Sequence, residues 1–412
     1  MKKKITIGLI GFGCVGEGLY QVLHQAKLLD AEIKWIVVKD REKKRSIPQS
    51  FFSYDIDAVI NDDEVNVVVE LIDDSMVALE IAKKTFAKGK HFITANKKMI
   101  AENLQELILR SREENVSFLY EGAVAGSIPI LRNLEEYYNN DSLSRVKGIL
   151  NGTSNYILTK TGEGQTYEQA LKTAQELGFA ESDPTLDVHG FDAKFKSVIL
   201  AKHAFGIAAR PEDILNVGVV NIVPEATAYG AVKSWSIKLL GRVEKVEDRL
   251  VSFVAPHFVE ETDPLHAVED EFNAVSVKGL FADEQQFYGK GAGAYPTASA
   301  VLSDISALQF DYKYEYRKEK IGNVSTVEEQ FFLKVFVGSK EEEGLDQIEL
   351  LSNDEQFRSK DFAYKVGWIE FSELKKHDWF NSNLTLVVLP DPLIISESEE
   401  LKNVEHINSL AI

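Results

Sequence analysis

Cysteine is nearly absent from this sequence of 412 residues, which contains only Cys14. A single cysteine excludes a disulfide within the chain and any metal cluster built on several cysteines, and it is typical of a reducing compartment. Long apolar runs are also missing, because the segment 5–10 behind the basic start is interrupted by Gly8 and is too short for a signal peptide or a membrane span. We therefore expect a soluble, cytoplasmic protein.

Positive charge is in the minority, with 46 Lys and Arg against 65 Asp and Glu, which gives a formal net charge of −19. Such a field repels nucleic-acid phosphates and anionic lipid, so we expect no nucleic-acid partner and no membrane partner. The remaining composition, 44% hydrophobic and 27% charged, is ordinary for a globular chain long enough for two or three domains.

Up to about residue 126 the sequence alternates β-rich apolar runs with amphipathic helical segments. Strands are expected at 5–10, 33–38, 65–72, 91–95 and 116–122, and helices at 15–27, 77–88 and 103–114. The apolar runs are too continuous for a sheet with one solvated face, which predicts a parallel sheet covered by helices on both sides. We therefore predict an α/β fold whose first domain, 1–130, is a doubly wound parallel sheet.

From about residue 131 the pattern changes to longer helices and to strands such as 250–256 and 274–278, which predicts an α+β domain at 131–296. The small apolar segment 297–308 predicts a helix that returns, near 297–318, to complete the first domain. The chain then becomes acidic, and we expect a small α+β module at 319–412. Its strands are expected at 331–337, 363–371 and 384–389.

The turn Gly11-Phe12-Gly13-Cys14-Val15-Gly16 follows the first expected strand and opens the first expected helix. This is the context of a dinucleotide-binding fingerprint, in which the three glycines serve a tight turn, close approach to a pyrophosphate and close helix packing. The helix N-terminus adds free N–H groups and the positive end of its dipole. We predict that this turn binds a dinucleotide, with Cys14 as a small space-filling residue rather than a nucleophile.

The end of the second strand, Lys39-Asp40-Arg41, bears on the choice between NAD and NADP. Asp40 can bond the ribose 2′-hydroxyl of NAD, whereas Lys39 and Arg41 can pair with the 2′-phosphate of NADP. We favour NADP slightly, and a solvated charged loop is the third interpretation.

A second polar cluster lies in the segment 177–196, where Pro184 and the glycines predict a loop that leads into a helix from Phe191 to Phe205. Asp192 and Lys196 are then one turn apart on one helix face, and a surface ion pair is the simplest interpretation. Four nearby carboxylates instead suggest a site for an ammonium group, such as that of an amino acid: Glu181, Asp183, Asp187 and Asp192. Lys196 could then protonate the oxygen formed when hydride reaches a carbonyl.

Two further segments lie at the expected carboxyl edge of the first sheet. Thr94–Lys98 follows the fourth strand, where doubly wound sheets bind ligands, although a connector with solvated lysines explains it as well. Glu121–Pro129 ends the fifth strand in small residues that can turn backbone carbonyls toward one point, which suits a hard cation.

Together these segments closely resemble the monofunctional homoserine dehydrogenase family. The resemblance is also carried by Asn151–Leu158 (N-G-T-S-N-Y-I-L) and by 289–304, which contains Gly291-Ala292-Gly293 and Pro296-Thr297-Ala298. It implies reversible NAD(P)H-dependent reduction of L-aspartate 4-semialdehyde to L-homoserine, in threonine and methionine biosynthesis, by a homodimer or homotetramer. The alternatives are a catalytically silent dinucleotide-binding regulator and an oxidoreductase for another amino-acid carbonyl.

The resemblance also implies roles for individual residues. Lys196 would donate the proton, and Lys97 would lie beside cofactor and substrate. The expected substrate contacts are Glu181, Asp192, Asp187, Asn151, Gly152 and Thr153. The expected cofactor contacts are Gly11, Phe12, Gly13, Cys14, Val15, Gly16, Lys39, Ser75, Lys97, Gly178, Gly291 and Gly293. A structural sodium ion would be held, chiefly through backbone oxygen, by Glu121, Val124, Gly126 and Ile128.

Two departures from the family pattern are visible. The chain has Asp73-Asp74-Ser75 after the third strand, where the family usually has small residues, which leaves cofactor preference open. Many members end in an ACT-type regulatory domain, and Phe331–Val335 resembles its first strand, but a turn like the usual Pro-Gly-Val-Leu is missing. We interpret 319–412 as degenerate ACT-like, which argues against feedback by threonine.

Overall fold

A computed structural model of the chain describes residues 4–26, 29–246, 249–320, 330–390 and 393. By its contacts the chain divides into two units. Unit 1 comprises 1–140, 198–210 and 287–321, and unit 2 comprises 141–197, 211–286 and 322–412. None of the described helices combines the length and the apolar character of a membrane span.

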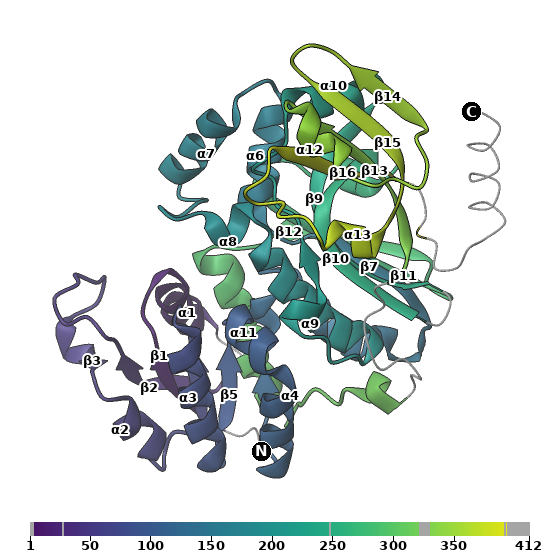
Figure 1. Ribbon diagram of the computed structural model, residues 1–412. Coiled ribbons are helices and arrows are strands. Elements are labelled where there is room, and N and C mark those ends of the chain that lie inside the picture. Colours follow the sequence, from purple (N-terminus) through teal and green to yellow (C-terminus); the bar gives the residue numbers. More distant parts are fainter. Residues whose placement is uncertain (1–3, 27–28, 247–248, 321–329, 391–392, 394–412) are drawn as a thin grey trace. The chain divides into compact units, whose positions relative to one another are not determined.

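Unit 1 is built on a six-stranded parallel sheet in the order β3-β2-β1-β4-β5-β6 (Figure 1). Its strands are β1 Ile5–Ile10, β2 Ala31–Val37, β3 Phe52–Ser53, β4 Val67–Glu70, β5 His91–Thr94 and β6 Phe118–Leu119. The helices between them are α1 Cys14–Gln25, α2 Ile56–Asn61, α3 Ser75–Ala87 and α4 Lys97–Glu113. Every residue of β1 and β4 is buried, which explains why their sequences are apolar except for Thr6 and Glu70. The predicted doubly wound parallel sheet is confirmed.

Two elements of unit 1 escaped prediction. Strand β3 and helix α2 have two and six residues, too few for a periodic pattern to emerge. The fifth predicted strand, 116–122, is also shorter than expected, because a 3₁₀ turn at Glu121–Ala123 follows β6. The helix predicted at 297–308 begins three residues earlier, as α11 Ala294–Leu308, and packs on α1 within unit 1.

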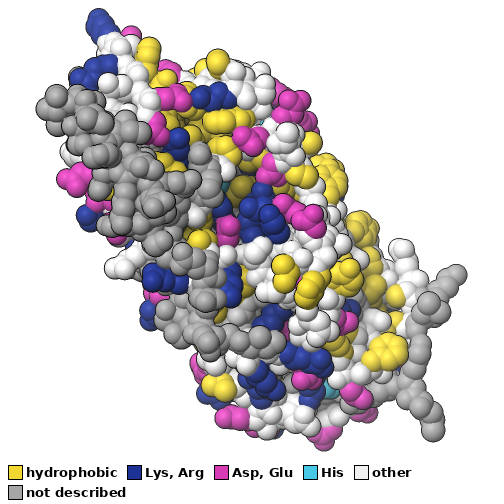
Figure 2. All heavy atoms as spheres, turned by 90° about the vertical axis from the view of Figure 1, so that its right-hand side faces the viewer, with side chains coloured by type: hydrophobic (Ala, Val, Ile, Leu, Met, Phe, Trp, Pro, Cys, Tyr) yellow, Lys and Arg dark blue, Asp and Glu magenta, His cyan; other side chains and the backbone are white. Residues whose placement is uncertain are grey.

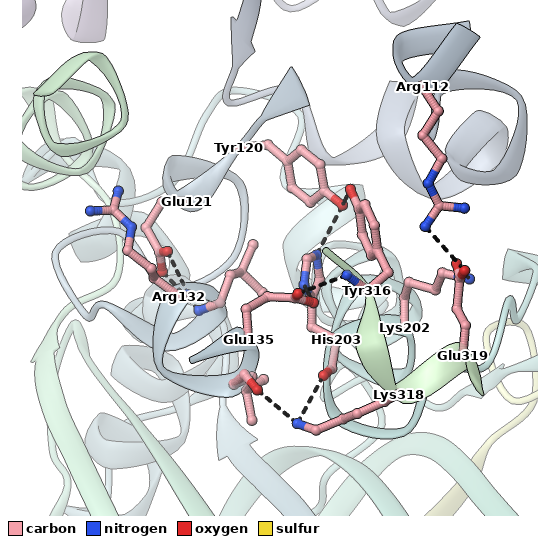
Figure 3. A network of polar contacts seen from close by, with 12 residues as sticks. Arg112, Tyr120, Glu121, Arg132, Glu135, Lys202, His203, Tyr316, Lys318 and Glu319 are labelled. Carbon is pink, nitrogen blue, oxygen red and sulfur yellow. Dashed lines mark hydrogen bonds and ion pairs between the residues drawn. The ribbon is translucent and has the colours of Figure 1, made fainter. Parts of the chain in front are cut away.

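A buried polar network holds the last turns of helix α9, Phe191–Phe205, within unit 1 (Figure 3). The His203 ring lies between Glu135 (Nδ1 to Oε1, 2.7 Å) and Tyr120 (Nε2 to Oη, 2.9 Å). Tyr316 closes the network, because its hydroxyl bonds that of Tyr120 at 2.9 Å and its N–H donates to Glu135 at 3.0 Å. Burial alone would raise the pKa of Glu135, but the hydrogen bond and charge of His203 outweigh it and lower that pKa.

A second ion pair of α9 lies beside this network (Figure 3). The Lys202 ammonium is 2.6 Å from one oxygen of Glu319, and Arg112 of α4 is 3.1 Å from the other. Lys202 is only 2% exposed, so α9 carries two buried lysines, Lys196 and Lys202.

Unit 2 contains a larger sheet in the order β12-β11-β7-β9-β10-β16-β13-β15-β14, with β8 paired to β10. Its first part consists of β7 Leu143–Ile149, β8 Leu215–Asn216, β9 Trp235–Val246, β10 Arg249–Glu260, β11 Phe272–Gly279 and β12 Glu284–Lys290. The helices here are α6 Gly152–Gly162, α7 Tyr167–Glu176, α8 Thr185–Val188, the start of α9 and α10 Pro224–Val232. The predicted strands 250–256 and 274–278 lie inside β10 and β11, and the helix predicted from Phe191 to Phe205 is α9.

The C-terminal module, 330–390, supplies β13 Phe332–Ser339, β14 Glu355–Arg358, β15 Ala363–Glu370 and β16 Leu384–Val388. Its neighbouring strands are antiparallel in the order β16-β13-β15-β14, which with α12 Glu342–Asp346 and α13 Phe371–Leu374 gives the βαββαβ arrangement of a ferredoxin-like unit. Both helices are reduced to about one turn. Strand β14 was not predicted, because all four of its residues are exposed and carry no apolar alternation.

The module shares a hydrophobic core with the rest of unit 2. Val251, Phe253 and Ala255 of β10 pack in one cluster with apolar residues of β13, β15 and β16. The predicted limits of three separate domains stay a prediction. On the face drawn in Figure 2, Lys and Arg side chains lie among Asp and Glu side chains, so the excess of acidic residues forms no continuous acidic surface there.

Candidate active site

The glycine turn after β1 has the geometry of a phosphate-binding turn. Gly11 has a φ of +101°, and a Cβ there would lie 2.3 Å from the carbonyl oxygen of Leu71. A Cβ on Gly16 would lie 2.3 Å from the carbonyl oxygen of Gly11, whereas one on Gly13 would meet nothing within 4 Å. The packing of the protein therefore requires glycine at 11 and 16, and the open space at Gly13 fits the close approach of a pyrophosphate.

The other residues of the turn complete this cradle. Phe12 is buried and packs edge-on against Phe52 with ring centroids 5.2 Å apart. Cys14 is exposed as the first residue of α1, so it does not fill space inside the protein. No side chain caps the N-terminus of α1. This fits a helix start whose N–H groups donate hydrogen bonds to phosphate oxygens.

A buried carboxylate, Glu70, joins the loops at the carboxyl edge of the sheet. It accepts hydrogen bonds from the Ile72 N–H and the Thr94 hydroxyl, both at 2.6 Å, and its complete burial raises its pKa to about 7. Thr94 in turn accepts from the N–H of Asn96, which caps α4 directly before Lys97. Glu70 was not predicted from the sequence, because its only signal is one carboxylate at the end of a valine run.

The charged residues after β2, Lys39, Asp40 and Arg41, differ in their contacts. Asp40 turns back on its own loop, where it accepts from the N–H groups of Glu42 (2.8 Å) and Lys43 (3.1 Å), and these bonds lower its pKa. The Arg41 guanidinium lies 4.5 Å from the centre of the Tyr54 ring, and Lys39 is exposed. The Asp40 carboxylate thus bonds its own loop, whereas the side chains of Lys39 and Arg41 do not contribute to these bonds and lie at the end of β2.

The unusual carboxylates after β4 have a partly structural explanation. Asp74 caps helix α3, because it accepts hydrogen bonds from the N–H groups of Met76 and Val77, both at 3.1 Å. Ser75 is the half-buried first residue of that helix. Asp74 therefore stabilises the helix start, and Asp73 is exposed beside it.

The turn predicted to hold sodium lies in unit 1, and its Glu121 carboxylate already accepts two backbone hydrogen bonds. Glu121 accepts from the N–H groups of Leu131 (2.8 Å) and Arg132 (2.9 Å), at the start of helix α5, Ile130–Glu135 (Figure 3). Burial raises the pKa of Glu121, and burial together with the Glu121 charge raises that of Asp304 in α11 to about 7. Arg132 pairs with Asp304 at 3.0 Å.

The described side chains offer no group of three or more His, Cys, Asp or Glu that could hold a metal ion. The predicted sodium site therefore depends on backbone oxygens of Val124, Gly126 and Ile128. Gly126 has a φ of +56°, and a Cβ there would lie 2.5 Å from the carbonyl of Gly291, which brings the predicted metal turn beside one predicted cofactor glycine. Gly293, with a φ of +120°, precedes α11.

Unit 2 brings four predicted residues into one buried cluster. The Lys196 ammonium lies 2.7 Å from Asp192 Oδ2 and donates to the carbonyl oxygen of Leu150 at 2.5 Å. The Asn151 amide donates to the same oxygen of Asp192 at 3.0 Å and to Asp187 at 2.7 Å. Lys196 is 6% and Asp192 3% exposed, so the surface ion pair considered from the sequence is wrong.

The turn between β7 and α6 positions this cluster. Asn151 caps α6, because its Oδ1 accepts from the Ser154 N–H at 2.8 Å, and this fixes the amide that faces the two carboxylates. Position 152 requires glycine, because a Cβ there would lie 2.5 Å from the carbonyl oxygen of Glu271. Thr153 donates to the carbonyl oxygen of Phe179 at 2.6 Å. The carbonyl of Leu150 was not predicted, because backbone oxygens leave no sequence signal.

Two predicted residues lie apart from the cluster. The Glu181 side chain is exposed and makes no hydrogen bond or ion pair with another described residue. Gly178 has a φ of +77° and ends helix α7, where its N–H donates to the carbonyl of Gln175. The structure therefore gives Gly178 a local role, and it gives Glu181 a contact only through its backbone carbonyl, which accepts from the Gln175 amide at 3.0 Å.

Comparison with known proteins decides the family. Residues 11–121 match the model of the homoserine dehydrogenase NAD-binding domain, and residues 129–306 match that of homoserine dehydrogenase. The chain is 39% identical over 316 residues to homoserine dehydrogenase of Bacillus subtilis (strain 168), which covers 74% of this chain and 73% of that protein. It is 40% identical over 313 residues to that of Helicobacter pylori, with 74% of each chain covered.

The chain belongs to the homoserine dehydrogenase family. A crystal structure of a homoserine dehydrogenase from Thiobacillus denitrificans has a TM-score of 0.81 at 28% identity and covers 94% of this chain and 99% of that one. One from S. aureus has a TM-score of 0.72 at 28% identity, with 95% and 99% covered. The predicted family, fold class and NAD(P)-dependent oxidoreductase activity are confirmed, and a silent regulator is not favoured.

The different surroundings of Gly13 and Gly16 in this homoserine dehydrogenase can be tested by adding a single methyl group at each position. Gly13→Ala is expected to leave the melting temperature unchanged and to weaken NADPH binding by about tenfold, because the added methyl occupies the space of the pyrophosphate. Gly16→Ala is expected to lower stability by about 1–3 kcal/mol, because its methyl meets backbone. Fluorescence titration measures NADPH binding, and thermal unfolding measures stability. Equal stability losses in the two variants would contradict the different roles of Gly13 and Gly16.

Proposed function

We propose that this chain interconverts L-aspartate 4-semialdehyde and L-homoserine with NADPH and that Lys196 is its proton donor. The observation that carries the assignment is the buried contact of Lys196 with Asp192 and the Leu150 carbonyl, in a family of dehydrogenases. The pathway leads to threonine and methionine.

The chemistry requires a positioned acid rather than a nucleophile. Bound NADPH supplies the hydride. Negative charge then develops on the former aldehyde oxygen, and an ammonium held nearby stabilises and protonates it; in the reverse direction the same amine accepts the proton. Leu150 and Asp192 orient Lys196 for this step. The sole cysteine, Cys14, takes no part, because reduction forms no covalent bond to the enzyme.

Recognition of the substrate is assigned to the polar groups around Lys196. We propose that Asp187, Asp192 and Glu181 receive the substrate ammonium and that Asn151, with Gly152 and Thr153, completes the pocket. The support is the hydrogen bonds by which Asn151 joins both aspartates. Glu181 has weaker support, because its exposed side chain would have to turn toward the substrate.

Cofactor binding is assigned to the turn 11–16. The support is the requirement for glycine at two of its positions and the open space at the third. We further propose contacts from Lys97 at the start of α4 and from Lys39, Ser75, Gly178, Gly291 and Gly293. NADP is preferred over NAD, because Asp40 bonds its own loop while Lys39 and Arg41 are placed at the end of β2.

Other properties rest on the family resemblance. We propose a homodimer or homotetramer in the cytoplasm, a sodium ion near Glu121, Val124, Gly126 and Ile128, and a C-terminal module that does not respond to threonine. The support for a cation there is the turn itself, in which Gly126 has a φ of +56°, because the Glu121 carboxylate already accepts two backbone hydrogen bonds and Asp304 already pairs with Arg132.

Lys196→Ala is expected to lower the rate of homoserine oxidation by at least about 10²-fold, the size of a lost general acid. Steady-state kinetics with saturating NADP measures this loss. Near-normal turnover in the variant would remove Lys196 from the mechanism.

Lys202→Ala is the matched control, because it removes another buried lysine with an ion pair from the same helix. Lys196→Ala is expected to lose about 3 kcal/mol of stability, since it leaves the buried Asp192 without its cation. Lys202→Ala is expected to lose less, since Glu319 is half-buried and keeps its ion pair with Arg112 at 3.1 Å. Only Lys196→Ala is expected to lose turnover in the folded protein, which separates lost chemistry from lost folding.

The double substitution Lys39→Gln and Arg41→Gln is expected to lower kcat/KM for NADP by about 100-fold, while kcat/KM for NAD stays within about threefold. Two hydrogen bonds to a charged phosphate are lost, each worth about 1.5–3 kcal/mol. Lys44→Gln, a change at another exposed cation of the loop, is the control. An equal loss with both cofactors would contradict the assignment.

Replacing NaCl by choline chloride at equal ionic strength is expected to lower the melting temperature if sodium occupies the turn at Glu121–Ile128. An ion that binds only the folded protein stabilises it, so its removal lowers the free energy of unfolding. Identical melting curves in the two salts would argue against the ion.

A further inference from the structure

An aromatic ring of the C-terminal module lies directly on the segment that joins Asp187 to Asp192. Phe380 stacks on His189, with ring centroids 4.7 Å apart and an interplanar angle of 9°. It also contacts Phe191, at 5.5 Å. The module therefore reaches the part of unit 2 that carries two of the proposed substrate carboxylates.

Phe380 is itself held in a rigid turn. The preceding residue, Trp379, is buried in the core of the module and donates its indole N–H to the Leu374 carbonyl at 2.7 Å. The Asn221 amide donates to the carbonyls of Trp379 (2.7 Å) and Ser382 (2.9 Å), on either side of Phe380. The ring is thus presented by backbone that is fixed at both ends.

The segment opposite Phe380 is held just as firmly by 216–219. Asn216 donates to the carbonyl of His189 at 2.8 Å, and the Val219 N–H donates to that of Val188 at 2.8 Å. The approach is so close that a Cβ on Gly218 would lie 2.3 Å from the Val188 carbonyl oxygen. Residues 188–191 therefore have one backbone support and one aromatic support.

The two carboxylates at the ends of this segment share one partner. Asp187 and Asp192 both accept from the Asn151 amide, and Asp192 also contacts Lys196. A shift of His189 between them would change both distances together, and displacements of about 1 Å in such arrangements can cost about 10²-fold in rate.

We propose that Phe380 is a positioning residue for the substrate-binding segment Asp187–Asp192, through its stack on His189. This rests on the proposed function of that segment. The C-terminal module then acts as a support for substrate recognition, and its contribution is exerted through ring packing rather than through contact with the reacting atoms.

Phe380→Ala is expected to raise the KM for L-homoserine about tenfold, to change kcat less, and to leave the Kd for NADPH within about twofold, because the cofactor turn belongs to unit 1. Phe380→Tyr keeps the stack and is expected to restore KM, whereas Phe380→Leu, which keeps apolar bulk without a ring, is expected to behave like the alanine variant.

Phe357→Ala is the control within the same module. Phe357 lies on β14, is 49% exposed and stacks on Tyr364, so its loss removes an aromatic contact without touching the segment. It is expected to leave KM and kcat unchanged. A KM unchanged in Phe380→Ala, or changed equally in Phe357→Ala, would overturn the proposal.

Amide hydrogen exchange gives a readout that does not require activity. Peptides covering 185–197 are expected to exchange faster in Phe380→Ala than in the wild type, and to be unchanged in Phe357→Ala. Absence of homoserine oxidation in the wild type would overturn the proposed function alone, while equal exchange in wild type and Phe380→Ala would overturn the positioning role alone.

Discussion

The buried ion pair of Lys196 with Asp192 is the interaction on which the functional part of this structure depends. Two opposite charges at 2.7 Å with almost no exposure are costly to desolvate, and they are tolerable only when further hydrogen bonds complete their shells. Those bonds come from the Leu150 carbonyl and the Asn151 amide, at the turn between β7 and α6. The cap that Asn151 makes on α6 is therefore also a constraint on the amine of the proposed proton donor.

A second constraint of the same kind organises the nucleotide-binding edge. Glu70 is buried at the end of β4 and bonds the loop after β4 and the end of β5 at once. Because its burial favours the neutral form, the hydrogen bonds that it accepts are what keep it in place. Buried carboxylates, rather than ion pairs at the surface, thus hold the loops that surround both proposed ligands.

The sequence predicts this architecture well where one local pattern decides the result. The largely apolar runs of β1 and β4 indicated the parallel sheet, because both faces of these strands are buried. The glycines 11, 13 and 16 indicated the turn, because the turn leaves no room for a Cβ at Gly11 and Gly16. The helix from Phe191 to Phe205 was predicted for the same reason. Short or polar elements such as β3, α2 and β14 were missed, since their place is decided by tertiary pairing.

The candidate site was predictable in its residue types and not in its geometry. The spacing of Asp192 and Lys196 placed them on one helix face, but their burial depends on contacts with the turn after β7, which is far away in the sequence. Glu70, the Leu150 carbonyl and the His203 network were not predictable as contacts. Their partners are far away in the sequence or are backbone atoms.

The shortened helices of the C-terminal module have a consequence for how this chain can be regulated. A ferredoxin-like unit normally covers one face of its sheet with its own two helices, whereas here β10 shares the core of the module. A rearrangement of such a unit around an effector would also disturb β10 and the sheet to which β10 belongs. If Phe380 positions the substrate-binding segment as proposed, mutations in this module would change substrate affinity, and the module would evolve under the same selection as the enzyme that it supports.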